Sequence, residues 1–144
     1  MTTFDLDGFL PYQLSVAASR VSRDFAALYK TRFGISVAEW RVVAHLSKAK
    51  APLSVREIHA RVDMDKSKVS RAAARLQAAG YLVKTDSRVD RRLVALELSA
   101  KGREMMNELA PLAEAFQQRL LARLGGRADG FLAGLETIAN DATD

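Results

Sequence analysis

Two segments of the chain begin a helix in the same way, and they lie close together along the sequence. Ser36 stands three residues before Glu39, and Ser54 stands three residues before Glu57. In this capping box the serine hydroxyl accepts a hydrogen bond from the glutamate's backbone N–H, and the carboxylate accepts one from the serine's N–H. We therefore expect one short helix to begin after Ser36 and another to begin after Ser54.

A third helix start follows almost at once. Asp65 is placed to cap a helix that runs to Gly80, where glycine favours a stop. Its apolar residues recur at helical spacing, and they are Val69, Ala72, Ala73, Leu76 and Ala79. Two short helices joined by a tight turn at residues 62–65 form a helix-turn-helix unit.

After Gly80 the apolar period changes to that of a strand. Residues 81–85 and 92–98 are predicted to be strands, the second with Val94, Leu96 and Leu98 on one face. The polar segment between them predicts a hairpin with a charged tip, a wing. The segment from about residue 35 to residue 98 is thus predicted to be a winged helix-turn-helix.

Long amphipathic helices flank this module. One occupies residues 10–33, and another begins after Ser99 and contains Pro111, where we expect a kink. A last helix carries Phe131, Leu132, Leu135 and Ile138. The predicted fold is mainly α with a small β-hairpin wing, divided into an N-terminal helix (1–33), a winged helix-turn-helix module (34–99) and C-terminal helices (100–144).

Positive charge is concentrated in the predicted module. Eleven of the 22 Lys and Arg residues, but only five of the 17 Asp and Glu residues, lie between Arg61 and Arg103, so this segment carries +6 while the whole chain carries +5. Such a patch favours a polyanionic partner, although a solvated basic surface remains an alternative.

The rest of the composition excludes several classes of protein. The chain has no cysteine, which removes disulfides, thiolate metal sites and thiol catalysis. It has no nucleophile–base constellation and no glycine-rich phosphate loop, and its only histidines are His45 and His59. We therefore expect no metal, no cofactor and no enzyme activity.

The N-terminus lacks the features of a signal peptide, and no segment is apolar enough to span a membrane, so we expect a soluble, cytoplasmic protein.

The outward face of the third helix has the composition of a surface that reads DNA. Ser67, Arg71, Ala74 and Ala78 lie opposite Val69 and Leu76 on a helical wheel. Arg71 can pair with a guanine edge in the major groove, and the alanines let the helix lie close to the bases. Phosphate contacts are expected from Ser67, Lys68, Ser70 and Arg75. Taken alone, the same residues also fit an ordinary solvated helix face.

The predicted wing tip carries three further arginines, Arg88, Arg91 and Arg92. A tip arginine can enter the minor groove, where the negative potential attracts it. Asp90 is expected to pair with Arg88 or Arg92 and to hold the tip in shape rather than to contact DNA.

These motifs resemble the MarR family, the multiple antibiotic resistance regulators. The resemblance extends over about residues 10–124. It rests on Glu39-Trp40-Arg41-Val42-Val43, Ser54-x-x-Glu57-Ile58, Ser67-x-Val69-Ser70-Arg71, Gly80-Tyr81-Leu82-Val83, Asp90-Arg91-Arg92 and Leu98-Ser99-x-x-Gly102-Arg103. His59, in place of a small apolar residue, and Val89, within the wing tip, depart from the family pattern.

The resemblance implies a homodimer that binds a palindromic operator in double-stranded DNA, with repression as the usual outcome. The terminal helices would form the dimer interface, and their apolar stripes agree with that role. Two-fold symmetry then predicts half-sites about one DNA turn apart.

The resemblance also implies an aromatic or phenolic effector, bound where the terminal helices meet the DNA-binding module. The residues this suggests are Tyr12, Arg20, Trp40 and His45. Each has another interpretation, because Trp40 also fits a core position, Arg20 a surface position and His45 an ordinary hydrogen-bonded histidine. The alternative function is a winged helix that binds protein or RNA without sensing a ligand.

Overall fold

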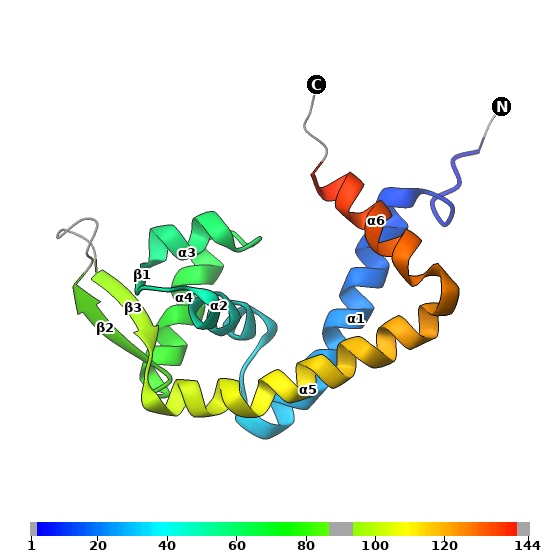
Figure 1. The fold of residues 1–144 in the computed structure, drawn as a ribbon. Helices are drawn as coiled ribbons and strands as arrows, with labels where there is room; N and C mark the ends of the chain where they lie inside the picture. The colour runs from blue at the N-terminus through cyan, green and yellow to red at the C-terminus, as the bar shows by residue number, and fades with distance from the viewer. Residues whose placement is uncertain (1–2, 87–93, 141–144) are drawn as a thin grey trace. The chain divides into compact units, whose positions relative to one another are not determined.

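The computed structural model describes residues 3–86 and 94–140 and divides the chain into two compact units, Met1–Leu109 and Ala110–Asp144. The described elements are α1 (Leu10–Phe33), α2 (Val37–Lys48), β1 (Leu53–Ser54), α3 (Val55–Arg61), α4 (Lys66–Ala78), β2 (Leu82–Asp86), β3 (Val94–Leu98), α5 (Ala100–Leu124), the 3-10 turn η1 (Gly125–Arg127) and α6 (Ala128–Ala139). The prediction of a mainly α fold with a small sheet is confirmed (Figure 1).

The three predicted helix starts are all present. The Ser36 hydroxyl accepts a hydrogen bond from the Glu39 N–H at 3.2 Å, and the Ser54 hydroxyl accepts one from the Glu57 N–H at 3.1 Å. Each glutamate accepts the return bond from its serine's N–H, so both capping boxes are complete. Asp65 Oδ1 accepts a bond from the Lys68 N–H at 2.9 Å and caps α4. A cap of this kind stabilises a helix by about 1 kcal/mol.

One apolar core joins α2, α3, α4 and the sheet in the first unit (Figure 1). Val42, Ile58, Val69 and Leu76 are fully buried in it. Each such side chain contributes about 1.5–3 kcal/mol through removal of its apolar surface from water. The core thus fixes which face of α4 points outward.

The sheet has three strands rather than the expected two. Its order is β1-β3-β2 and all pairs are antiparallel, with Leu53 opposite Leu96 and Leu82 opposite Leu98. The additional strand, β1, is only two residues long and was not predicted. Leu96 and Leu98 are buried as expected, but Val94 is exposed because it pairs with Asp86 at the end of the hairpin that extends beyond the core.

Aromatic packing fixes the C-terminal half of α1 to α2. The ring of Tyr29 stacks on Trp40 at 5.6 Å between centroids, and Phe25 meets Trp40 edge-on at 5.2 Å. Burial raises the pKa of Tyr29 to about 12, and the nearby Arg41 opposes part of that rise. Gly34 ends α1 in a left-handed conformation, with a φ of 68°.

The second unit consists of the remainder of α5, η1 and α6. Its boundary lies just before Pro111, which has no N–H to bond with the Asn107 carbonyl. Among residues 110–140, all of them described, none is buried. The predicted break at Gly125-Gly126 is a single 3-10 turn between two helices. Among the residues the structure describes, no helix is both long and apolar enough to cross a membrane.

Candidate nucleic-acid interface

The outward face of α4 is exposed along its whole length. The exposed residues include every one that the sequence places on this helix as a DNA contact: Ser67, Lys68, Ser70, Arg71 and Arg75. Ala74 and Ala78 are exposed as well, while Val69, Ala72, Ala73 and Leu76 are buried on the opposite face. We call this exposed surface, residues 67, 68, 70, 71, 74, 75 and 78, the α4 face.

The α4 face carries three cations. Lys68, Arg71 and Arg75 form no ion pair with another described residue. Ser67 and Arg71 lie four residues apart and Ala74 follows three residues later, so they form one line along the helix. A row that begins with a hydroxyl and a guanidinium and continues with small side chains allows close approach of a polar, anionic surface.

The first turn of α4 differs from a free helix N-terminus. The Asp65 carboxylate already accepts the Lys68 N–H and places a negative charge there. Any anion that approaches this end is therefore attracted mainly by the side chains of Ser67 and Lys68 rather than by the helix dipole.

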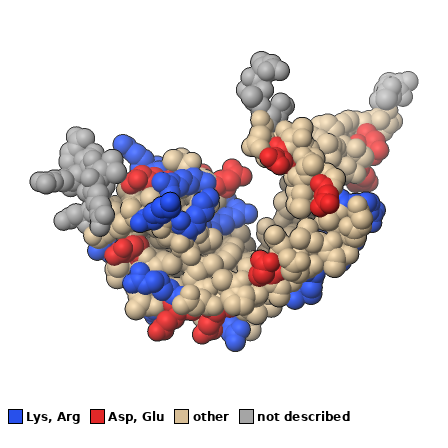
Figure 2. Space-filling view, viewed as in Figure 1, with Lys and Arg blue, Asp and Glu red and all other residues tan. Residues whose placement is uncertain are grey.

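Basic side chains also gather next to α4, over α3, as Figure 2 shows. Helix α3 exposes Arg56 and Arg61. Sequence reasoning did not propose these two residues as contacts. The available signal was the helix-turn-helix arrangement itself, because the first helix of such a unit crosses the DNA backbone.

The C-terminal end of α4 is held by the first turn of α5. The Ser99 hydroxyl donates to the Gly80 carbonyl at 2.6 Å, and Lys101 Nζ donates to the Ala79 carbonyl at 2.7 Å. The Lys101 ammonium also lies 4.6 Å from the centre of the Tyr81 ring. A cation at the end of a helix is favourable because the terminal carbonyls carry partial negative charge.

Gly102 allows this close contact. A Cβ atom at this position would lie 2.3 Å from the Tyr81 carbonyl oxygen, too near for any other residue. The Ser99 N–H also donates to that same oxygen at 2.9 Å. We call this contact the α4–α5 clamp. It joins residues 79–81, at the end of α4, to Ser99, Lys101 and Gly102, at the start of α5.

The predicted wing-tip contacts lie outside the described residues. These contacts are Arg88, Arg91 and Arg92. Asp90, which is predicted to hold the tip in shape, and Val89 also lie outside the described residues. Strands β2 and β3, which would carry the tip, are described up to the pairing of Asp86 with Val94. The predicted roles of the tip residues remain predictions.

The four suggested effector residues do not form one cluster within a single chain. Trp40 is half-buried against Phe25 and Tyr29, as the alternative interpretation expects. Tyr12 and Arg20 are exposed on α1, and Tyr12 lies 17 residues before Tyr29, which is about 25 Å along a helix. Tyr12 is therefore too far along α1 to contact the same small ligand as Trp40 within one chain.

His45 lies on α2 among other cations. Its pKa is lowered from the ordinary value, first by burial and then by the positive charges of Lys48 and Arg61. Burial and these two positive charges thus disfavour the protonated form of the imidazole. Among the described residues, no three His, Asp or Glu side chains are grouped so that they could hold a metal ion.

Comparison with known proteins points to one family. A family model described as the MarR family matches residues 33–93. The HTH-type transcriptional regulator PapX of Escherichia coli is 26% identical over 113 residues, which are 78% of this chain and 69% of PapX.

Solved structures give the same result. A MarR/EmrR family transcriptional regulator from Acinetobacter sp. ADP1 is similar with a TM-score of 0.83 and 25% identity, over 96% of this chain and 97% of that one. Bordetella bronchiseptica BpsR, whose DNA binding is regulated by 6-hydroxynicotinic acid, has a TM-score of 0.81 and 21% identity, over 99% of this chain and 100% of BpsR.

Proposed function

Since the chain belongs to the MarR family of winged-helix transcriptional regulators, we propose that it is a homodimeric repressor that binds a palindromic operator through α4. Membership also means that the chain is a DNA-binding regulator and not an enzyme. The observation that carries the proposal is the α4 face, where small residues and cations that form no ion pair with another described residue lie on a helix whose other side is buried in the core.

The residues of the α4 face take different parts in this proposal. Arg71 reaches a base edge, because its planar guanidinium can donate two parallel hydrogen bonds to a guanine. Ser67, Lys68, Ser70 and Arg75 contact phosphates, which position the helix but carry no sequence information. Arg56 on α3 adds a phosphate contact outside the α4 face.

The wing extends the contact into the minor groove. Arg88, Arg91 and Arg92 supply the cations, and Asp90 orients them. This part of the proposal is supported by the sequence and by the position of β2 and β3 between the two halves of the α4–α5 clamp in the chain.

In this proposal two copies of the chain form the functional dimer. The proposed dimerisation regions are residues 1–33 and 100–144, on either side of the DNA-binding module at 34–99. The support is exposed apolar surface on these helices, from Leu10 and Tyr12 on α1 and from Phe131, Leu135 and Ile138 on α6. Such side chains in one row are unfavourable in water and indicate a protein partner.

A small aromatic effector releases the DNA in this proposal. It is supported by the similar fold of BpsR, which responds to 6-hydroxynicotinic acid. Tyr12 and Arg20 from one chain, together with Trp40 and His45, are the residues proposed to bind it.

The test is a titration of a fluorescent duplex with increasing salt. If about six phosphates are neutralised, the logarithm of the binding constant falls against the logarithm of salt with a slope of about −5. Single-stranded DNA and duplex RNA of equal length serve as controls. Equal affinity for all three, or no dependence on salt, would instead favour a winged helix that binds RNA or protein.

A further inference from the structure

Residues 79–81 connect α4, the helix with the proposed DNA-reading face, to β2, the first strand of the wing. Gly80 lies at their centre with a φ of 85°, a left-handed conformation that glycine adopts without strain. The N–H groups of Gly80 and Tyr81 donate back to the carbonyls of Gln77 and Leu76, at 3.0 and 2.9 Å. The N–H side of the connection is therefore bonded to α4 itself.

The carbonyl side of the same connection is bonded to the first turn of α5, which begins beside the end of α4 (Figure 1). Lys101 Nζ donates to the Ala79 carbonyl at 2.7 Å, and the Ser99 hydroxyl donates to the Gly80 carbonyl at 2.6 Å. The Ser99 N–H donates to the Tyr81 carbonyl at 2.9 Å. Hydrogen bonds on both sides of this short segment limit how the chain can turn between α4 and β2.

Lys101 differs from Ser99 in the part of the chain that it holds. The Ser99 N–H only continues the β2–β3 ladder, in which the neighbouring pair is Leu82 opposite Leu98. Ala79, by contrast, is the C-cap residue of α4. Lys101 therefore ties the end of the helix to the base of the wing, and its positive charge is attracted by the partial negative charge of the helix end.

The α4–α5 clamp has an exposed part that lies outside the core. Ala79, Gly80 and Lys101 are exposed, whereas Val69 and Leu76 of α4 are fully buried. A change in the Lys101 side chain therefore alters the connection between α4 and β2 without leaving a cavity in the core.

We propose that Lys101 is a positioning residue for DNA recognition. It fixes the direction in which β2 and β3 leave α4, so that the wing enters the minor groove while the α4 face lies in the major groove. A duplex presents its two grooves at a set separation, and both contacts form together only if the wing is held at the matching angle. Holding that angle before binding lowers the entropy lost on binding. The inference rests on the proposed function, because that function supplies both groove contacts.

Protection from dimethyl sulfate tests the proposal, because this reagent methylates guanine N7 in the major groove and adenine N3 in the minor groove. The probe is a labelled duplex that the wild-type protein selects from a random-sequence pool. The wild-type protein should protect both kinds of base.

Lys101→Met retains a long side chain but removes its charge and its hydrogen-bond donor. This variant should still protect guanine N7 and should no longer protect adenine N3. Its affinity for the selected duplex should fall about fivefold, as loss of one charge-assisted hydrogen bond at the surface predicts.

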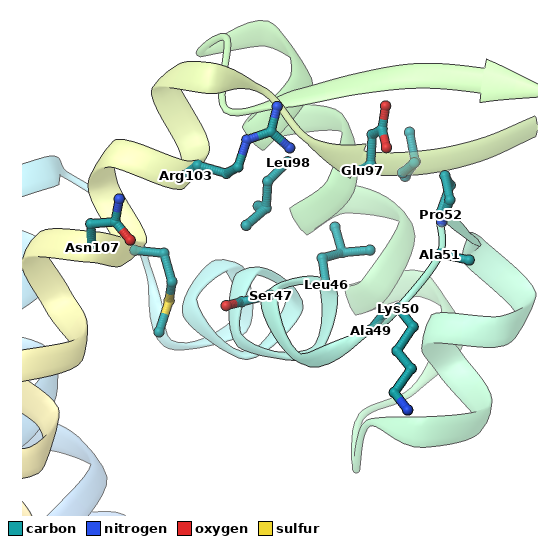
Figure 3. Close-up of a pocket in the computed structure, with 12 residues that line it drawn as sticks. Leu46, Ser47, Ala49, Lys50, Ala51, Pro52, Glu97, Leu98, Arg103 and Asn107 are labelled. Carbon is teal, nitrogen blue, oxygen red and sulfur yellow. The ribbon is translucent and has the colours of Figure 1, made fainter.

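Three further variants separate position from charge. Lys101→Arg keeps the charge and a donor, and it should protect both grooves as the wild-type protein does. Gly102→Ala keeps the charge but brings a Cβ atom too close to the Tyr81 carbonyl oxygen, so the turn must move and protection at adenine N3 should be lost. Arg103→Met removes the same charge as Lys101→Met, but the Arg103 side chain lines a cavity beside Leu46 instead of joining the clamp (Figure 3). It should leave protection in both grooves unchanged.

Hydrogen exchange tests the clamp without DNA. In Lys101→Met, the amide hydrogens of Ser99 and of residues 79–81 should exchange about tenfold faster than in the wild-type protein. In Lys101→Arg they should exchange at the wild-type rate. The amides of Val69 and Leu76 should be unaffected in both variants, which shows that the core is intact.

Three results would overturn the proposal. They are unchanged exchange at residues 79–81 in Lys101→Met, equal loss of protection in both grooves in that variant, and the same loss of adenine N3 protection in Arg103→Met. If the wild-type protein itself protects neither groove, or only one, the proposed function is wrong and the positioning role fails with it. The exchange rates would then still report whether Lys101 holds the end of α4.

Discussion

Helices α4 and α6 are almost equal in length, at 13 and 12 residues, but they expose opposite kinds of surface. Helix α4 buries Val69 and Leu76 completely and exposes serine, arginine and alanine. Helix α6 buries no residue, and its large apolar side chains are 37–50% exposed. An amphipathic pattern therefore predicts a helix, but it does not predict the surface against which the helix's apolar side packs. For α4 that partner is this chain's own core, and for α6 we propose a second copy.

Helix α1 shows the same contrast within one element. Its C-terminal half buries Ala26 and Tyr29 against the first unit, whereas Leu10 and Tyr12 in its N-terminal half are exposed. One half thus belongs to the module's core, and the other is available to a partner.

The largest expected effect comes from the buried side of α4. Leu76→Ala should lower the free energy of unfolding by about 2–5 kcal/mol, because it leaves a cavity in a fully packed core. Urea denaturation measures this loss, which should be the same at low and high protein concentration. Ala74→Ser, on the exposed side of the same helix, is the matched control. A loss below about 1 kcal/mol for Leu76→Ala would show that α4 is not fixed in the core.

The next largest effect is expected on the oligomeric state, from substitutions on the exposed apolar side of α6. The double variant Leu135→Lys, Ile138→Lys should convert the protein from dimer to monomer, because two unpaired charges would be buried in the proposed interface. Light scattering at micromolar concentration measures the mass, and Thr137→Lys, on the same helix, adds one charge as a control. A wild-type monomer under these conditions would contradict the proposed role of α6.

A smaller effect is expected on the exposed side of α4. Arg71→Ala should cost about 1–3 kcal/mol on the operator and relax the choice of sequence. Lys68→Ala should instead weaken binding to all duplexes alike and reduce the salt slope by about one. Fluorescence anisotropy on specific and random duplexes separates the two. Equal losses on both duplexes for Arg71→Ala would make it a phosphate contact only.

The smallest effect is a dependence of stability on pH. The pKa of His45 is lowered in the folded protein, so the unfolded chain binds this proton more readily. The stability contribution is therefore present above about pH 6.5 and declines as the pH falls below it. His45→Gln should flatten the urea midpoint between pH 5 and pH 8. The opposite slope, with His45 stabilising at low pH, would contradict its lowered pKa.

The sequence predicted most of the first unit because its signals are local. Ser36, Ser54 and Asp65 each cap a helix through a bond to a residue three positions later. Strand β1 was missed because two residues carry no periodicity, and its pairing with β3 joins positions about forty residues apart. The bond from Lys101 to the Ala79 carbonyl spans 22 residues, so it could be found only in three dimensions. The pocket lined by the end of α2, residues 49–52, the end of β3 and the first turns of α5 combines segments far apart in the chain, so no sequence pattern predicted it.

Footprinting on the DNA that adjoins this protein's own gene tests the central claim most directly, because it reports DNA binding and symmetry together. The account predicts two protected half-sites with centres about one helical turn apart, related as an inverted repeat, and loss of both in Arg71→Ala. A single protected half-site would contradict the dimer. Uniform weak protection that is unchanged in Arg71→Ala would contradict sequence-specific binding through α4.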